Sequence, residues 1–175
     1  MKVPLDTGGP VETEWVETAS PGEINLTPPA GYEARFDRPV QVSIDMRRVG
    51  EEFFMDGSVE TPVTYTCVRC LNEFPSAVAT DFSLIVHRVT APAAQSGELE
   101  AYVEVPLGTS EFDVGPYARE ALLLAAPLTP HCRENCLGLC ARCGADLNKE
   151  ACRCVAKELD PRWEALKNIA SRERS

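Results

Sequence analysis

The sequence has few of the residues from which catalytic centres are most often built. It contains two histidines among 175 residues, and neither has a recognisable nucleophile and base around it. His87 lies near the end of an apolar segment, so we interpret it as an ordinary strand residue. His131 directly precedes Cys132, which makes it a minor candidate for a metal ligand. We therefore expect no enzymatic activity and no small-molecule substrate.

The chain also lacks a long apolar run and a recognisable export signal. Its longest apolar run, residues 121–128, is far shorter than the ~20 residues that cross a membrane. The first residues are polar and acidic, with no apolar central stretch. We therefore expect a cytoplasmic protein with no membrane partner. In that reducing compartment, closely spaced cysteine pairs indicate metal ligands rather than disulfides.

Positive charge is scarce over most of the chain. There are 17 Lys and Arg residues against 27 Asp and Glu residues, a formal net charge of −10. Residues 1–130 carry 8 basic and 20 acidic side chains, whereas residues 131–175 carry 9 and 7. Because affinity for phosphate is built from Lys and Arg contacts, the acidic body argues against coating nucleic acid by bulk charge. The mildly basic tail leaves a local contact open.

The pattern of apolar residues predicts a mainly β body. From Val40 to Met46, apolar residues alternate with polar ones, as in a strand that buries one face. We predict further strands at residues 23–27, 53–60, 63–67, 78–89 and 102–105. No interval between them is long enough for a helical crossover, which favours an antiparallel sheet or a partly open barrel. The predicted fold class is α+β.

Two helices are predicted after the strands. The first spans Pro116–Ala126, with Asp113 as its N-cap and a proline directly after its end. Its apolar residues Ala118, Leu122 and Ala125 share one helical face, which we expect to be buried. The second begins at Asp160 and extends through Ser171. These elements divide the chain into a loosely ordered N-terminus (1–18), a β-rich body with a short helix (19–130), and a zinc-binding segment with a terminal helix (131–175).

The eight cysteines occur as four closely spaced pairs. They are Cys67 and Cys70, Cys132 and Cys136, Cys140 and Cys143, and Cys152 and Cys154. Zn²⁺ takes four ligands in a tetrahedron and favours thiolates, and a C-x-x-C turn aims two sulfurs at one point. Gly144 follows the third pair and can adopt the positive φ that such a knuckle often needs. We therefore predict structural zinc as the cofactor.

Two pairings of these cysteines are open at this stage. In the first, Cys140, Cys143, Cys152 and Cys154 close one site locally, and Cys67, Cys70, Cys132 and Cys136 form a second site that ties the C-terminal segment to the β body. In the other, the middle four cysteines share one ion and the outer four share the second. We favour the first pairing because it closes one site within a short hairpin.

Other chemistry is compatible with some of these residues. Cys67 and Cys70 have the spacing of a thiol-redox pair. In thioredoxin-like proteins such a pair lies between a strand and a helix, whereas the residues after Cys70 do not resemble the start of a helix. Eight thiolates are also enough for iron–sulfur clusters. Four arginines lie within or beside the cysteine pairs, where they either offset thiolate charge or contact RNA phosphates; these are Arg69, Arg133, Arg142 and Arg153.

Four segments together resemble the YceD family of bacterial and plastid proteins. They read CVRCLNEF from Cys67, DVGPYARE from Asp113, CLGLCARCGADLN from Cys136 and DPRW from Asp160. The resemblance covers roughly residues 40–169. It implies a role in accumulation of large-subunit ribosomal RNA, with ribosomal RNA or a large-subunit ribosomal protein as the partner. It carries over no enzymatic activity.

Overall fold

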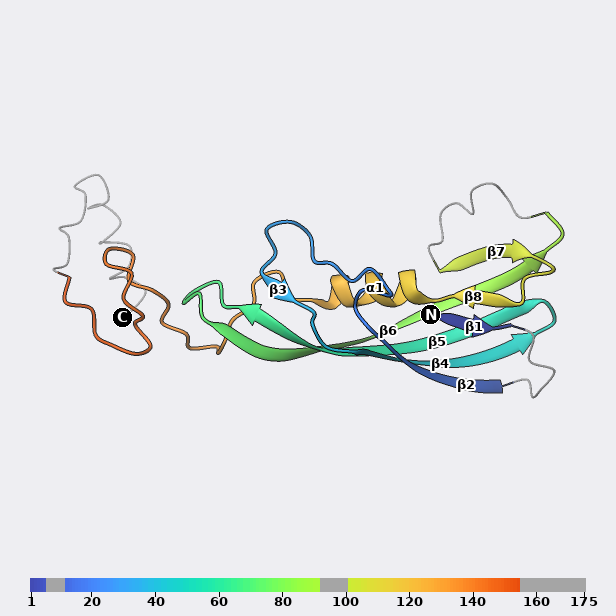
Figure 1. Cartoon of the computed structure of the whole chain (residues 1–175), viewed down its shortest axis with the longest axis horizontal. Helices are drawn as coiled ribbons and strands as arrows, with labels where there is room; N and C mark the ends of the chain where they lie inside the picture. Colours follow the sequence, from blue (N-terminus) through green and yellow to red (C-terminus); the bar gives the residue numbers. More distant parts are fainter. Residues whose placement is uncertain (6–11, 92–100, 155–175) are drawn as a thin grey trace, which may run out of the picture.

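A twisted open β-sheet with one covering helix forms the body of the molecule (Figure 1). The structure is a computed structural model, and it describes residues 1–5, 12–91 and 101–154. Across the main sheet the order is β2 (Glu12–Ala19), β4 (Val40–Val49), β5 (Glu52–Thr66), β6 (Glu73–Val89) and β7 (Tyr102–Pro106). Strand β3 (Ala34–Arg35) pairs with one end of β5, and β1 (Lys2–Pro4) pairs with β8 (Glu111–Asp113) in a second, two-stranded sheet. The α+β class is confirmed, with the main sheet open rather than closed into a barrel.

The strands alternate buried and exposed residues, so the sheet has one apolar face. On β4, Val42 and Ile44 are fully buried, while the intervening positions are more exposed. In register, Ile44 lies opposite Gly57 of β5, and Gly57 lies opposite Phe82 of β6. A Cβ atom at Gly57 would lie 2.5 Å from Cζ of Phe82. The glycine therefore marks a place where the packed face leaves no room for a side chain.

Helix α1 (Gly115–Ala125) covers the apolar face of the sheet. Ala118 and Leu122 are fully buried against it, as the helical spacing of apolar residues predicted. The prediction was wrong at two details. The N-cap is Val114 rather than Asp113, although the Asp113 carboxylate accepts a hydrogen bond from the N–H of Gly115 at 3.0 Å. Ala125, expected on the buried face, is exposed.

Several predicted strands differ from those observed. Residues 53–60 and 63–67 were predicted as two strands. They belong to the single strand β5, except for Cys67, which follows the last residue of that strand, Thr66. Pro62 lies between the residues of β5 that pair with β4 and those that pair with β3, so its missing N–H breaks no ladder on that side. Residues 23–27 form the end of a turn followed by two residues without regular structure, instead of a strand. Backbone bonds such as that from the N–H of Leu26 to the carbonyl of Pro21 hold this turn closed.

Two further differences concern the edges of the sheet. Strand β7 runs parallel to β6, whereas an antiparallel neighbour was expected. The first 18 residues, expected to be loosely ordered, contain β1 and most of β2. Trp15 of β2 is half-buried and lies opposite Ile44, and this burial on the apolar face helps to order the strand.

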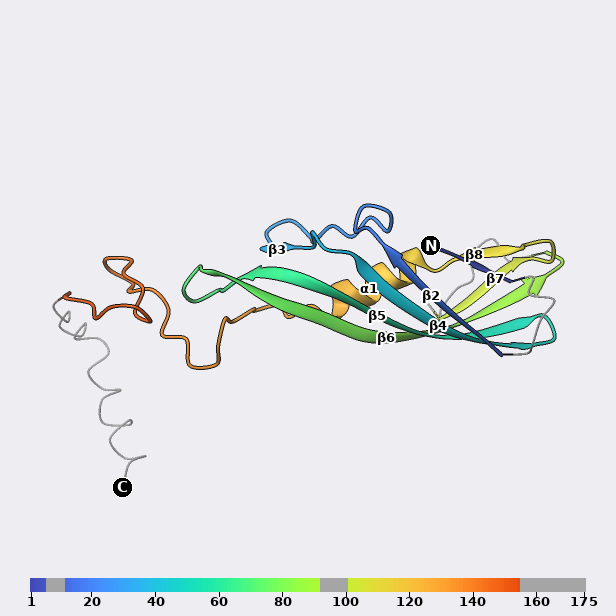
Figure 2. The same ribbon diagram turned by 60° about the horizontal axis from the view of Figure 1, so that its bottom comes forward.

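After α1 the chain leaves the helix and runs past the end of the sheet where β5 turns into β6 (Figures 1 and 2). In the described part of this segment, residues 126–154, the regular pairing consists of one isolated bridge between Leu139 and Asp146. The predicted helix from Asp160 to Ser171 lies outside the described residues. No helix in the described ranges is long and apolar enough to cross a membrane.

Candidate metal centres

The connection from β5 to β6 forms a tight knuckle that presents two cysteines. The N–H of Cys67 donates to the carbonyl of Asn72, and the N–H of Leu71 donates to the carbonyl of Cys67, both at 2.9 Å. Leu71 adopts φ 57°, in the left-handed region that non-glycine residues rarely occupy. Cys67 and Cys70 thus lie on the same side of a turn that two long strands hold in place.

These two cysteines meet a second pair from the C-terminal segment. The Sγ atoms of Cys67, Cys70, Cys132 and Cys136 all lie within 4.8 Å of one another. The separation is 3.9 Å from Cys67 to Cys136 and 3.7 Å from Cys70 to Cys132. Four thiolates at about 2.3 Å from one tetrahedral ion are ~3.8 Å apart, whereas disulfide-bonded sulfurs are ~2.05 Å apart. The group therefore has the dimensions of a four-coordinate metal centre, which we call site 1.

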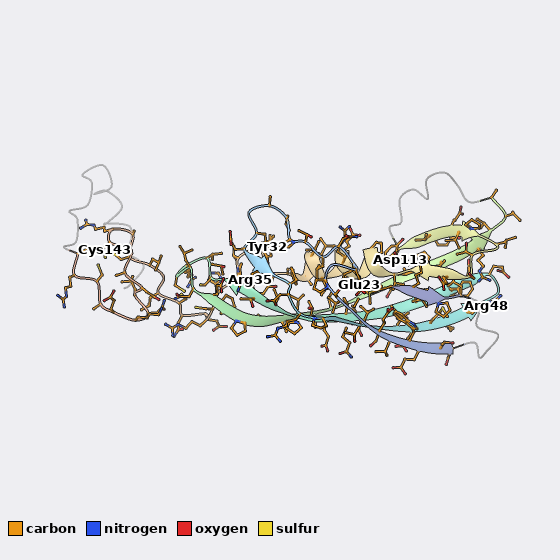
Figure 3. The ribbon with its side chains drawn as sticks, in the orientation of Figure 1. Glu23, Tyr32, Arg35, Arg48, Asp113 and Cys143 are labelled. Carbon is orange, nitrogen blue, oxygen red and sulfur yellow. The ribbon has the colours of Figure 1, made fainter. Side chains whose placement is uncertain are left out.

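The remaining four cysteines form a second group, which we call site 2. The Sγ atoms of Cys140, Cys143, Cys152 and Cys154 also lie within 4.8 Å of one another. Cys152 is 3.2 Å from Cys140 and 3.6 Å from Cys143, somewhat closer than the ideal tetrahedral spacing. Gly144 has φ 74°, and its N–H donates to the carbonyl of Cys140 at 2.9 Å, which repeats the knuckle of site 1. Figure 3 shows Cys143 at the end of the molecule remote from β8.

Backbone N–H groups point at the cysteine sulfurs and favour their thiolate form. Burial on its own raises the pKa of Cys67, but N–H groups of Cys132, Cys70 and Arg69 outweigh it and lower that pKa to about 6. The N–H groups of Cys143 and Arg142 lower the pKa of Cys140 to about 6. Because the thiolate is the form that ligates metal, both knuckles prepare a ligand.

In each group, the proximity of the four sulfurs raises the pKa of at least one other thiol. Burial, followed by the neighbouring thiols of site 1, raises the pKa of Cys132 to about 12. The neighbouring thiols of site 2 raise the pKa of Cys154 to about 12. Each group therefore resists holding four negative charges by itself. A central divalent cation removes this penalty, since a coordinating thiol is deprotonated outright.

A short polar network joins site 1 to the hairpin of site 2. The side-chain amide of Asn72 donates to the Asp146 carboxylate at 2.8 Å, and the backbone N–H of Asn148 donates to it at 3.0 Å. These two bonds, the Asn72 bond first, hold the pKa of Asp146 well below its usual range. The side-chain amide of Asn148 donates to Sγ of Cys136 at 3.4 Å. Such bonds to a ligand from outside the coordination shell orient it and tune its affinity for metal.

Two of the arginines near the cysteines have structural partners. The guanidinium of Arg69 donates to the carbonyls of Glu134 and Cys136, at 3.2 and 3.1 Å. Arg133 donates to Oδ1 of Asn148 at 2.6 Å. Both side chains therefore hold loops together around site 1, which favours the structural interpretation of these two residues over contact with RNA.

The eight predicted ligands fall into two groups, in the first of the two pairings that the sequence left open. His131 belongs to neither group among the described residues. His87 is a strand residue whose Nδ1 atom lies 2.6 Å from the hydroxyl of Tyr102. The sequence interpretation assigned no role to Asn72, Asp146 or Asn148. Their one signal was position, since all three lie in the segments that carry the family resemblance.

Two groups of four cysteines, one buried against the β-sheet and one in an exposed hairpin, define a cysteine-rich α+β protein whose sulfurs are spaced to hold metal ions. The chain belongs to the YceD family, because the family model described as "Large ribosomal RNA subunit accumulation protein YceD" matches residues 55–170. This confirms the resemblance that the four motifs indicated. No solved structure matches the chain.

Curated relatives come from plants and mycobacteria. A chloroplastic large ribosomal RNA subunit accumulation protein YCED homolog 1 of Arabidopsis thaliana is 29% identical over 155 residues, covering 75% of this chain and 48% of the relative. The Zea mays protein of the same name is 28% identical and covers 69% of this chain and 50% of the relative. An uncharacterized protein of Mycobacterium leprae is 28% identical, with 75% and 59% covered. The chain spans about half the length of its plant relatives.

Proposed function

We propose that this protein is a non-catalytic zinc protein that supports accumulation of large-subunit ribosomal RNA. It would act in biogenesis of the large ribosomal subunit by binding ribosomal RNA or a large-subunit ribosomal protein. The observation that carries the zinc assignment is the tetrahedral spacing of site 1, 3.7 and 3.9 Å between pairs of Sγ atoms. The family description and the plant relatives' names support the role in ribosomal RNA accumulation.

The surroundings of Cys67 and Cys70 favour a structural ion over thiol-redox exchange. Their side chains are 0% and 4% exposed, and two further cysteines share the same small space. Redox cysteines need a thiolate that an outside disulfide can reach, which these residues do not offer. An iron–sulfur cluster would place several irons and sulfides between its thiolates and so hold them farther apart. One ion per group fits the tight spacing best.

Neighbouring cysteine sulfurs lie 3.2 to 3.9 Å apart within the two groups, a spacing suited to metal ligands rather than disulfides. Cysteine-ligated metal in place of disulfides is typical of a reducing compartment. We therefore place the protein in the cytoplasm as part of the same proposal. The exposed hairpin of site 2 extends from the sheet, and the metal would order it despite its few regular backbone pairs.

Native mass spectrometry of protein purified without chelator tests the metal assignment. Two zinc ions per chain are expected. One ion would leave a group of four cysteines idle and would require a test of Cys67 and Cys70 for exchange with dithiol reagents. No ion, together with a disulfide between Cys67 and Cys70, would replace the zinc assignment with the redox alternative.

The ribosomal role is tested by deleting the gene and measuring the ratio of large-subunit to small-subunit ribosomal RNA. The ratio should fall on deletion, and the wild-type chain should restore it. A chain with Cys67→Ser and Cys136→Ser should not restore it, whereas the exposed control Ser76→Ala should. An unchanged ratio in the deletion strain would contradict the role in ribosomal RNA accumulation.

A further inference from the structure

The face of the main sheet opposite α1 is open to solvent within the described part of the chain (Figures 1 and 2). We call it the open face, and Figure 3 shows its side chains projecting away from the helix. Strand alternation and register place every second residue of β2, β4, β5 and β6 there. Seven exposed carboxylates belong to it: Glu12, Glu14, Asp45, Asp56, Glu60, Glu73 and Asp81.

Positive charge on the open face is scarce in the described part of the chain. At one end of β5 the register places Arg35 of β3 there, opposite Thr64, and its guanidinium is paired with Glu73 at 2.7 Å. Among the described residues of those four strands, Arg47 is the Lys or Arg residue that the register places there. Its guanidinium lies 5.2 Å from the centre of the Phe54 ring. Arg48 and Arg88 both lie over the ring of Phe53, on the opposite face. The open face therefore attracts cations and repels the phosphates of a nucleic acid.

The open face is also hollowed along its length. Three shallow depressions, of about 690, 250 and 390 Å³, follow one another along the strands. Gln41 and Glu60 line both the second and the third depression, so those two are continuous. Residues 54–62 of β5 run beneath the whole row, which at ~3.3 Å per residue gives a trough roughly 25 Å long. That length suits about eight residues of extended polypeptide.

The largest depression combines apolar and acidic walls, and Arg47, whose guanidinium lies over the Phe54 ring, is the basic residue in its lining. Phe54 and Ile85 offer apolar surface there, and Asp56 is fixed by a hydrogen bond from the Ser83 hydroxyl at 2.7 Å. Lys and Arg side chains suit such walls, because their aliphatic stems pack on apolar surface while the charged head reaches a carboxylate. A sugar–phosphate backbone would meet the carboxylates with charge of the same sign.

We propose that the open face binds a Lys- and Arg-rich polypeptide segment that lies extended along β5. The inference rests on the proposed function in ribosome assembly and selects a basic protein, rather than RNA, as the partner on this face. The acidic charge of the open face favours a basic partner. The row of depressions along β5 favours a partner segment in an extended conformation.

The test compares two triple variants that change net charge equally. The open-face variant carries Glu14→Gln, Asp45→Asn and Glu60→Gln. The control carries Glu33→Gln, Asp37→Asn and Glu134→Gln, three exposed acids outside the four strands and the three depressions. Binding of a dye-labelled ten-residue peptide that alternates lysine and valine is measured by fluorescence anisotropy on the zinc-loaded full chain. A ten-nucleotide uridylate RNA with the same dye serves as the second probe.

The open-face variant should bind the peptide about tenfold more weakly than wild type, because three favourable charge contacts are lost. The control should stay within about twofold of wild type. Equal weakening in both variants would show attraction by bulk charge and would overturn the proposal. Tighter binding of the RNA than of the peptide by wild type would overturn it as well.

Complementation of the deletion strain tests binding at the open face separately from the role in ribosomal RNA accumulation. In the deletion strain, the control variant should restore large-subunit ribosomal RNA and the open-face variant should not. If both variants restore it, the open face has no part in assembly, and the proposal fails while the proposed function stands. If deletion itself leaves the RNA unchanged, the proposed function fails whatever the peptide data show.

Discussion

Asn148 connects more parts of the C-terminal segment than any neighbouring side chain described. Its amide donates to Sγ of Cys136 and to Asp146, and its Oδ1 accepts from Arg133 and from the backbone N–H of Leu137 at 2.9 Å. We predict that Asn148→Ala lowers the affinity of site 1 for zinc about tenfold, the lower end of the range for such supporting residues. Competition with a chromogenic chelator measures this affinity.

The matched control for that variant is Asn135→Ala. Asn135 is exposed and lies directly before Cys136. It is the same residue type beside the same metal ligand, but it takes no part in the contacts made by Asn148. Its replacement should leave zinc affinity unchanged. Equal affinities for Asn148→Ala and the control would mean that the ligands of site 1 are oriented by the backbone alone.

Tyr65 makes stability depend on pH in the alkaline range. Its side chain is 2% exposed, and its hydroxyl has no hydrogen-bond partner among the described residues. Burial, with the adjacent Tyr32 adding to it, raises the pKa of Tyr65 well above its usual range. The native state therefore holds the neutral phenol, and the stability that depends on it is present below about pH 10 and is lost as pH rises beyond that.

We predict that Tyr65→Phe is as stable as wild type at neutral pH or more stable by about 1 kcal/mol, because it removes an unpaired buried hydroxyl. Its advantage should widen as pH rises to about 10.5, where the unfolded tyrosine ionises. Urea unfolding at both pH values measures the difference. Tyr102→Phe, which loses the contact with His87, should show no gain at neutral pH. A constant difference between Tyr65→Phe and wild type would contradict the pKa shift.

At the scale of the elements, the central strands depend on one close approach. Gly57 of β5 lies between Ile44 and Phe82, and a Cβ there would come within 2.9 Å and 2.5 Å of their side chains. We predict that Gly57→Ala lowers the free energy of unfolding by about 1–3 kcal/mol, because the packed face must shift to admit a methyl group. Urea denaturation measures the loss.

Two further variants identify the cause of that loss. Ser58→Ala, one residue along on the exposed face of β5, should change stability by less than about 0.5 kcal/mol. Adding Phe82→Leu to Gly57→Ala should restore part of the loss, since it removes the ring atoms nearest to the new methyl group. A double variant no more stable than Gly57→Ala would place the strain in the backbone rather than in the ring contact.

At the scale of the whole molecule, the two centres attach the C-terminal segment to the sheet. Backbone bonds such as that from Val68 to the carbonyl of Pro130, at 3.0 Å, assist at the same end. We predict that removal of metal exposes residues 131–154 to protease, because these residues have few regular backbone pairs, while the sheet and α1 persist on their own apolar core. Limited proteolysis with mass mapping of the fragments measures this.

A variant of site 2 alone separates the two centres. Cys140→Ser with Cys152→Ser should make residues 140–154 protease-sensitive and leave residues 132–139 protected by site 1. Cleavage throughout the sheet in the metal-free protein would instead show that the β body needs metal to fold.

Much of the secondary structure could be predicted because it depends on local pattern. The alternation in β4 and the spacing of Ala118 and Leu122 in α1 reflect burial of one face, which periodicity reveals. Prediction failed where longer-range contacts decided the conformation. β2 is ordered by pairing with β4. β7 pairs in parallel with β6, and the local pattern of residues does not reveal the direction in which two strands pair.

By itself, the sequence determined the residue types and local spacings of the candidate site. Pairs such as Cys67 and Cys70, or Cys140 and Cys143, reach one point because a tight turn spans three residues, and that is local geometry. Only the tertiary structure decided which pairs share a group, since the ends of β5 and β6 bring the first pair to Cys132 and Cys136. It alone also placed seven carboxylates on one open face, because that depends on register across four strands.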